Sequence, residues 1–399
     1  MHRNRSLPAP ITTIILITTA HFFHHQLTAL VVPLLPFMRD GLELTYAQAG
    51  TLVSAFALSY GFGQLPAGWL ADRIGPRYLL LAGISGVALA GALVGLTGTY
   101  GALIVFLIAM GLLGGGYHPA ATPAISSAVP PEQRGRAMGI HLVGGSASHL
   151  VAPLLGVALA TALGWRGAFL TISVPVFVFG TALFLFFRHA DPAPRHSARA
   201  PLTSASNDTN PEVPIALFVA ITSVAGAFVA SAIAFVPLYL VDVVGMTQGG
   251  AGVALALFFS AGLWAAPLGG VVADRFGTLT VFGIAVGLVA PLIFLIGIAP
   301  SALYALIGLV LLGATMFVRM VVSESYLIGA VAPARRSTVL GIYFFAGMEG
   351  SGVITPLLGG VIDRYGFSVA FSVAGGVAFL AMAGLGLAMV VLSRRQVIA

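Results

Sequence analysis

The chain has 399 residues, of which 58% are apolar and only 8% are charged. Soluble domains carry roughly 25% charged residues, so this composition excludes a water-soluble globular fold and predicts a protein embedded in lipid. The net charge is +6, every positive charge is an arginine, and cysteine is absent. The lack of cysteine excludes disulfide bonds and thiolate metal ligands.

Apolar runs of about 20 residues, the length that crosses a bilayer, recur along the whole chain. We expect spans at 11–37, 47–71, 77–97, 101–126, 137–162 and 167–187, and again at 213–241, 249–273, 279–299, 301–329, 337–362 and 367–392. A polar segment rich in Pro, Ser and Arg separates the two sets. We therefore expect an all-α membrane protein with a six-helix bundle over 1–187, a linker over 188–213 and a second six-helix bundle over 214–399.

The arginines between the expected spans gather on one side of the membrane. With the N-terminus inside, fourteen of them fall on the cytoplasmic side, and only Arg39, Arg166 and Arg364 fall on the other. Because positive loops mark the cytoplasmic side, we expect both termini and the linker in the cytoplasm and the protein in the inner (plasma) membrane. This topology explains the basic charge without a nucleic-acid partner.

A charged octet occurs twice, with an offset of 202 residues. The copies read Gly68-x-x-Ala71-Asp72-Arg73-x-Gly75 and Gly270-x-x-Ala273-Asp274-Arg275-x-Gly277. Two copies of a multi-span bundle are typical of a transporter whose path lies between the halves.

Six plus six spans, a central linker and this loop motif resemble the major facilitator superfamily over essentially the whole chain. The resemblance implies two bundles related by pseudo-two-fold symmetry, alternating access and a monomeric protein. It also implies that the motif loops lock the bundles together on the cytoplasmic side. The residues expected to act in this gate are Asp72, Arg73, Arg77, Asp274 and Arg275, with Arg134 and Arg336 in the neighbouring loops either as their partners or as topology signals.

Further stretches of the chain resemble drug:proton antiporters of that superfamily. Ser148-x-x-x-Ala152-Pro153-x-x-Gly156 and Ser351-x-x-x-Thr355-Pro356-x-x-Gly359-Gly360 are similar to its antiporter motif, in which small residues and a proline let helices approach and bend. Tyr117-His118-Pro119 followed by Val143-Gly144-Gly145, together with Ala20-His21, is similar to the fosmidomycin-resistance branch.

Ionisable side chains in mid-span cost roughly 2.5–3.5 kcal/mol each on insertion scales, so they usually face a cavity or a partner. The residues at this depth are His21, His24, His25, His118, His149, Arg319 and Glu349, while Glu324 and His141 lie closer to the cytoplasmic helix ends. The family resemblance implies that spans 3, 6, 9 and 12 face lipid and that the others line a central cavity. All of these residues fall on the cavity spans.

Glu349 is the residue that we expect to carry a proton, because carboxyl groups inside transporter spans act as proton relays. Arg319 is the one arginine away from the loops, and its planar guanidinium suits a carboxylate or phosphonate on the substrate. The alternative is a permanent Glu349–Arg319 pair that ties spans 10 and 11 together.

The intramembrane histidines admit three interpretations. His24 and His118 can relay protons, and the same two with His25, His149 and Tyr117 can line the substrate site. His21, His24 and His25, at spacings of three and four on one helix, can alternatively bind a transition metal. The third interpretation is hydrogen bonding between packed helices.

The spacing His21-x-x-His24-His25 also matches the histidine box of membrane di-iron desaturases, but such sites need about eight histidines in several boxes near the membrane surface. We therefore expect a non-enzyme without a cofactor. The favoured function is a secondary transporter for the proton-coupled export of a small organic compound, including an anionic one, or a drug. Proton-linked uptake of an organic anion and transition-metal transport through the histidines are the alternatives.

Overall fold

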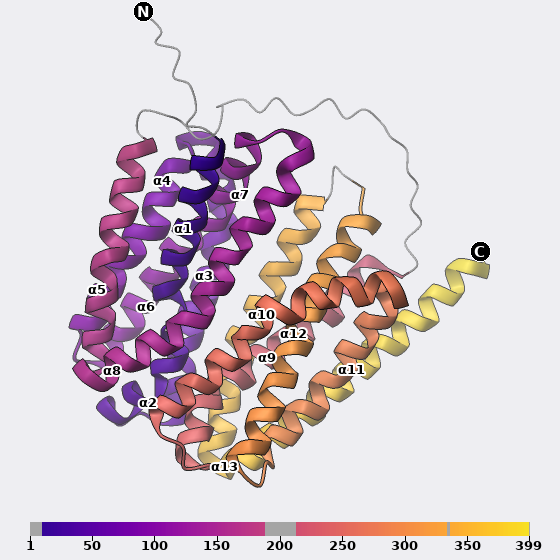
Figure 1. The fold of residues 1–399 in the computed structure, drawn as a ribbon. Coiled ribbons are helices and arrows are strands. Elements are labelled where there is room, and N and C mark those ends of the chain that lie inside the picture. Colours follow the sequence, from indigo (N-terminus) through magenta and orange to yellow (C-terminus); the bar gives the residue numbers. More distant parts are fainter. Residues whose placement is uncertain (1–9, 188–212, 333–335, 399) are drawn as a thin grey trace, which may run out of the picture. The chain divides into compact units, whose positions relative to one another are not determined.

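The computed structural model describes residues 10–332 and 336–398 apart from 188–212, and all regular structure within them is helical. The first half contains α1 (Pro10–Thr28), α2 (Val31–Leu42), α3 (Tyr46–Ile74), α4 (Pro76–Leu81), the π-helical turn η1 (Ala82–Gly86), α5 (Val87–Leu96), α6 (Tyr100–Gly114), α7 (Tyr117–Ala128), the 3₁₀ turn η2 (Pro131–Gln133) and α8 (Arg134–Phe187). The second half contains α9 (Ile215–Asp242), α10 (Gln248–Phe276), α11 (Thr278–Gly297), α12 (Ala302–Ala330) and α13 (Arg336–Ile398). Figure 1 labels the α-helices. The all-α membrane fold is therefore confirmed.

These helices accommodate the twelve expected spans. Helices α1 and α2 together form one span, α4 to α5 a second and α6 with α7 a third. Helices α8 and α13 are each long enough for two spans, and each contains one residue with non-helical backbone, Gly164 and Gly366. Helices α9, α10, α11 and α12 are each long and apolar enough to cross a membrane once. Helix α3 has 29 residues and lies at the position of an expected span, but it is less apolar than these helices.

The duplication extends from the motif to the backbone. Four pairs of helices begin 202 residues apart, namely α3 and α10, α4 and α11, α6 and α12, and α8 and α13. The described residues with positive φ also fall into three pairs at the same offset: Glu43 with Gly245, Gly75 with Gly277, and Gly164 with Gly366. The two halves therefore share the positions of their chain reversals as well as their helix starts.

Gly164 and Gly366 make the sharp turns in α8 and α13. Their φ/ψ angles are 73°/164° and 78°/171°, a region that is essentially restricted to glycine. Each glycine thus divides its long helix into two antiparallel spans without a loop.

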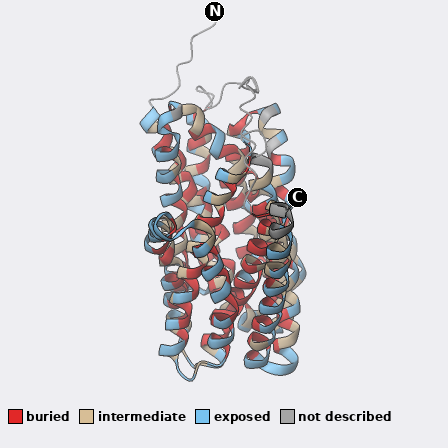
Figure 2. Cartoon of the chain, turned by 90° about the vertical axis from the view of Figure 1, so that its right-hand side faces the viewer, coloured by how far each residue is buried: buried red, intermediate tan, exposed pale blue. Residues whose placement is uncertain are grey.

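By their contacts, the described residues form two compact units. Unit 1 comprises those of Met1–Glu43 and Ala55–Ala200, and unit 2 comprises those of Leu44–Ser54 and Pro201–Ala399. The start of α3 joins unit 2 because Asp363 accepts hydrogen bonds from the backbone N–H groups of Tyr46 (2.8 Å) and Ala47 (2.9 Å), which have no partner within the helix. In each unit the buried stretches lie mostly on helix faces that turn towards neighbouring helices (Figure 2).

Candidate functional site

Unit 1 contains a cluster of six histidines, which we call the histidine cluster. Helix α1 supplies three of them, α7 supplies one and α8 supplies two; they are His21, His24, His25, His118, His141 and His149. Neighbouring rings are separated by 4.2 to 5.9 Å between centroids. The structure therefore brings together every intramembrane histidine that the sequence singled out.

The π-helical turn η1 holds His24 in place. His24 is fully buried, its Nδ1 donates to the Gly83 carbonyl at 2.7 Å, and its Nε2 lies 3.1 Å from the Tyr60 hydroxyl. A π-turn breaks the regular i→i−4 hydrogen-bond pattern, and Gly83 lies within this turn. The irregularity thus places a carbonyl oxygen beside the histidine.

Tyr117 forms the aromatic floor of the cluster. Its ring stacks on His24 at 4.5 Å and on His21 at 5.5 Å, and its hydroxyl donates to the Ile17 carbonyl at 2.9 Å. Tyr117 is fully buried and has its hydrogen bond within the protein, so it shapes the cluster and positions the rings.

The Val143-Gly144-Gly145 stretch lets α8 approach α1 closely. A Cβ atom at Gly145 would overlap the His21 ring, and one at Gly144 would overlap the Thr18 carbonyl. This close approach allows His21 Nδ1 to donate to the carbonyl of His141 at 2.9 Å. The motif therefore has a packing role that serves the cluster.

Two members of this site were not predicted from the sequence. His141 was placed near the cytoplasmic helix end, but its ring is buried and stacks on His21 with centroids 4.2 Å apart. For His141 the sequence did contain a signal, because His141, Gly145 and His149 are four residues apart and so lie on one helix face. Nothing in the sequence indicated Tyr60 of α3.

The structure changes which histidines could bind a metal ion together. Instead of His21, His24 and His25, two sets have all their ligand nitrogens within 4.8 Å of one another, and His118 belongs to both. One set is His24, His25 and His118, and the other is His21, His118 and His141.

Unit 2 contains a second polar site around Arg319 on α12, which we call the arginine site. Arg319 is only 4% exposed, and its Nη1 donates to the Thr222 carbonyl at 2.8 Å and to the Thr222 hydroxyl. The Tyr343 hydroxyl is hydrogen-bonded to both side chains, and Ser323 Oγ lies 2.9 Å from Thr222 Oγ1. Arg319 Nε has no hydrogen-bond partner among the described residues.

The expected Glu349–Arg319 pair is not what the structure shows. The carboxyl group that interacts electrostatically with Arg319 is that of Glu324, five residues further along α12. Glu349 on α13 is half-buried, and its Oε1 has no hydrogen-bond partner within the described part of the chain. Similar depth on two helices was therefore insufficient to predict a contact.

The gate residues lie at the helix ends where the motif placed them, and their role remains a prediction. The guanidinium groups of Arg73, Arg77 and Arg275 lie over the rings of Trp69 (4.0 Å), Tyr78 (4.8 Å) and Phe276 (5.3 Å) respectively. Arg134 Nε donates to the Ser126 carbonyl at 3.0 Å, and Asp274 is exposed. The side chains of Asp72 and Arg336 and most of the linker lie outside the described residues.

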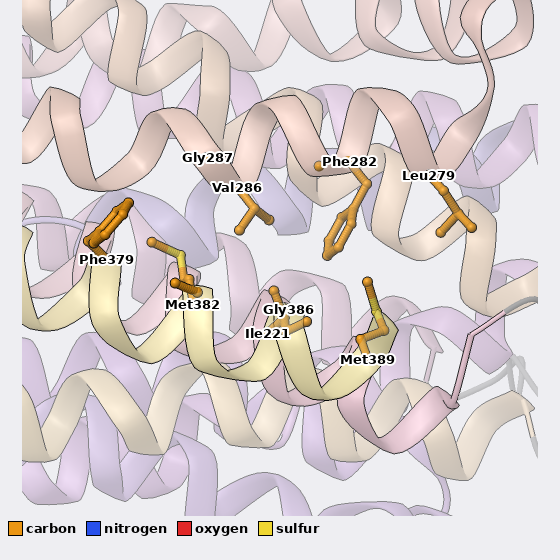
Figure 3. A pocket seen from close by; sticks show the side chains of 11 residues that line it. Ile221, Leu279, Phe282, Val286, Gly287, Phe379, Met382, Gly386 and Met389 are labelled. Carbon is orange, nitrogen blue, oxygen red and sulfur yellow. The ribbon is translucent and has the colours of Figure 1, made fainter. Parts of the chain in front are cut away.

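An apolar pocket of ≈ 260 Å³ lies between α9, α11 and α13 in unit 2. Figure 3 shows Phe282 and Val286 of α11 pointing towards Met382 and Met389 of α13. Its lining contains no ionisable residue, so it is separate from the arginine site.

The family is decided by a match along almost the whole chain. The Major Facilitator Superfamily profile matches residues 17–250 and 216–397. The chain belongs to the Major Facilitator Superfamily. With its apolar helices it is a multi-pass membrane protein of that superfamily, as the loop motif and the duplication predicted.

Among the relatives, the multidrug resistance protein MdtG of Proteus mirabilis is 27% identical over 363 residues, which cover 88% of this chain and 89% of that protein. A probable sulfoacetate transporter of Cupriavidus necator is 35% identical over 41% of this chain, and a probable L-galactonate transporter of Escherichia coli is 30% identical over 39%. These two matches span only 37% and 34% of the relatives' own lengths.

Solved transporter structures share the fold. A bacterial homologue of the human lysosomal transporter Spinster superposes with a TM-score of 0.76 at 18% identity, and a POT family transporter superposes with 0.80 at 13% identity. Both alignments cover 98% of this chain and 98% of the other. At these identities the likeness concerns the fold alone.

Proposed function

We propose that this superfamily member is a proton-coupled secondary transporter of the inner membrane that exports a small organic compound, with an anionic group as the preferred feature. Both termini would lie in the cytoplasm, as the arginine distribution predicts. The MdtG relatives support export, because they match along most of their length and are named for multidrug resistance.

The observation that carries the proposal is the arginine site. A guanidinium buried within the membrane is costly. Glu324 interacts with it electrostatically, but its hydrogen bonds go to the neutral oxygens of Thr222 and Tyr343. Its Nε remains available among the described residues. A planar guanidinium with an unused N–H can donate to a carboxylate, sulfonate or phosphonate of the cargo.

Glu349 is the proposed proton carrier. Its Oε1 is buried without a partner among the described residues, which is costly for a polar atom unless the group gains one during the working cycle. Protonation supplies a hydrogen to this carboxyl group, and in an exporter driven by proton entry the protonated protein releases the cargo while the deprotonated protein binds it. The exchange couples proton movement to cargo release.

The proposal is tested by flux into proteoliposomes under an imposed pH gradient. The substrates are phosphonates, organic acids and drugs of different charge, and empty liposomes are the control. An inside-acid gradient should drive uptake of at least one anionic compound, because protons leave as the cargo enters. Gradient-independent flux of every compound would contradict proton coupling.

Proton-linked uptake of an organic anion is the second candidate. It is favoured by the relatives named as sulfoacetate and L-galactonate transporters. The same assay separates the two functions, because a symporter accumulates its anion when the outside, rather than the inside, is acidic.

A further inference from the structure

We propose that His24, His25 and His118 form a binding site for one divalent transition-metal ion in unit 1. Neutral imidazole is a preferred ligand of Zn²⁺, Co²⁺, Ni²⁺ and Cu²⁺. The ligand nitrogens of these three residues already lie within 4.8 Å of one another. The inference is independent of the organic cargo proposed for unit 2.

The hydrogen bonds of the cluster leave Nε2 lone pairs available. A carbonyl oxygen can only accept, so Nδ1 of His21 carries the hydrogen that it donates to His141, and Nδ1 of His24 carries the hydrogen that it donates to Gly83. His149 donates to a backbone carbonyl in the same way. Neutral rings held by Nδ1–H then present a bare Nε2. The same outer-sphere bond orients the histidines of known metal sites.

His25 completes this pattern through Thr28. The Thr28 hydroxyl donates to the His24 carbonyl at 3.2 Å, and His25 Nδ1 lies 3.0 Å from the Thr28 oxygen. When His25 Nδ1 donates to the Thr28 oxygen, the His25 Nε2 carries a lone pair that can bind an ion. This Nε2 lies 3.1 Å from the Nε2 of His21, within hydrogen-bonding distance.

The separation of these two nitrogens also fits a pair that binds one metal ion. With metal–nitrogen bonds of about 2.0–2.1 Å, two ligand nitrogens are about 2.9 Å apart at a right angle and about 3.4 Å apart at the tetrahedral angle. The 3.1 Å between the Nε2 atoms of His25 and His21 lies within that interval. His21 therefore lies beside the fourth coordination position of the proposed site.

Ring orientation decides between the two sets of three histidines. An ion lies in the plane of each imidazole that binds it, but the His21 and His141 rings are nearly parallel, with an angle of 13° and centroids 4.2 Å apart. These planes do not converge on one point. The rings of His24, His25 and His118 cross at 71°, 80° and 39°, with centroids 4.8 to 5.9 Å apart.

The chosen set is also reachable. His25 and His118 are half-buried, whereas two members of the other set are buried. His24 is fully buried, and its Nε2 lies 3.1 Å from the Tyr60 hydroxyl. The ion must displace this hydroxyl, so Tyr60 competes with the metal for His24.

Titration of the purified protein with Co²⁺, followed by visible absorption and calorimetry, tests the site. The protein is purified through a histidine-free tag, so the bound metal reports on the chain itself. We expect one Co²⁺ ion to bind per protein and to show visible d–d absorption bands typical of nitrogen ligands. His25→Gln and His118→Asn should each weaken binding about 100-fold or more, whereas the matched control His141→Gln should bind like the wild type.

Two further variants keep the test informative when a histidine variant is unstable. Tyr60→Phe removes the competing hydroxyl and should bind Co²⁺ at least as tightly as the wild type. Thr28→Val removes the oxygen that orients His25 and should weaken binding about tenfold. Size-exclusion profiles and circular dichroism confirm the fold of every variant.

Three results would overturn the proposal. They are no stoichiometric binding of Co²⁺ by the wild type, binding by His25→Gln and His118→Asn that is as tight as in the wild type, or a loss of binding in His141→Gln alone. The titration uses no ion gradient. Its failure would therefore leave the proton-coupled function standing, and failure of the flux assay would leave the metal site standing.

Discussion

The histidine cluster of unit 1 and the arginine site of unit 2 occupy equivalent positions of a duplicated framework. The offset of 202 residues relates Tyr117 to Arg319, and His24 to Gly226. In unit 1 the aromatic ring stacks on the histidine. In unit 2 a Cβ atom at Gly226 would lie only 3.1 Å from Nη2 of Arg319, so a glycine makes room for the guanidinium. The backbone was conserved between the halves while the polar chemistry diverged.

This divergence would let one architecture offer the two kinds of ligand chemistry that we propose. Imidazole lone pairs suit a metal cation, and a guanidinium suits an anion. Both groups are anchored to backbone oxygens, His24 to that of Gly83 and Arg319 to that of Thr222. Both side chains are thus anchored in the same way, and in our proposals the residue at each position sets the charge of its ligand.

The largest expected effect comes from Arg319→Gln. This change keeps some hydrogen bonding but removes the positive charge, so we expect transport of an anionic substrate to fall about 100-fold, in line with the loss of a charge-assisted hydrogen bond. Arg319→Lys keeps the charge but loses the planar fork and should retain part of the activity. Initial flux rates at several substrate concentrations measure both variants. Full activity of Arg319→Gln would remove Arg319 from substrate binding.

Gly226→Leu tests whether the space in unit 2 exists for the arginine. The added side chain would displace the guanidinium from Thr222, so the substrate KM should rise about tenfold. Gly226→Ala should have a smaller effect, because its Cβ meets only the flexible end of Arg319. An unchanged KM in Gly226→Leu, with the protein folded, would break the proposed equivalence of Gly226 and His24.

The paired glycines test the shared framework. Gly164→Ala and Gly366→Ala should each reduce stability by about 1–3 kcal/mol, because alanine is strained at these backbone angles. Gly376→Ala is the control, since its Cβ would meet open space. Thermal unfolding in detergent measures the three variants. A large effect at only one of the paired glycines would show that the two turns are not equivalent.

The smallest expected effect is that of Tyr117→Phe. Loss of the hydrogen bond to Ile17 should cost about 0.6 kcal/mol, a typical value between membrane helices. Proton-driven flux should remain near the wild-type rate, in contrast to Arg319→Gln at the equivalent position. A flux loss as severe as that of Arg319→Gln would show that Tyr117 contacts the cargo.

Hydropathy and the 202-residue offset were sufficient to predict the spans and the duplication, because both depend on local composition. Depth along the helices also predicted that His24, His118 and His149 would lie together. Contacts across helices were harder to predict. His141 joins the cluster because the small Gly145 lets α8 approach α1, and Arg319 interacts with Glu324 of its own helix rather than with Glu349. Helix rotation and interhelical distance decide such contacts, and hydropathy does not report them.

Glu349→Gln in proteoliposomes tests whether proton movement through Glu349 drives cargo transport. This variant should lose accumulation driven by a pH gradient but should still exchange labelled for unlabelled substrate without a gradient. Normal gradient-driven accumulation by Glu349→Gln would contradict the proposed role of Glu349.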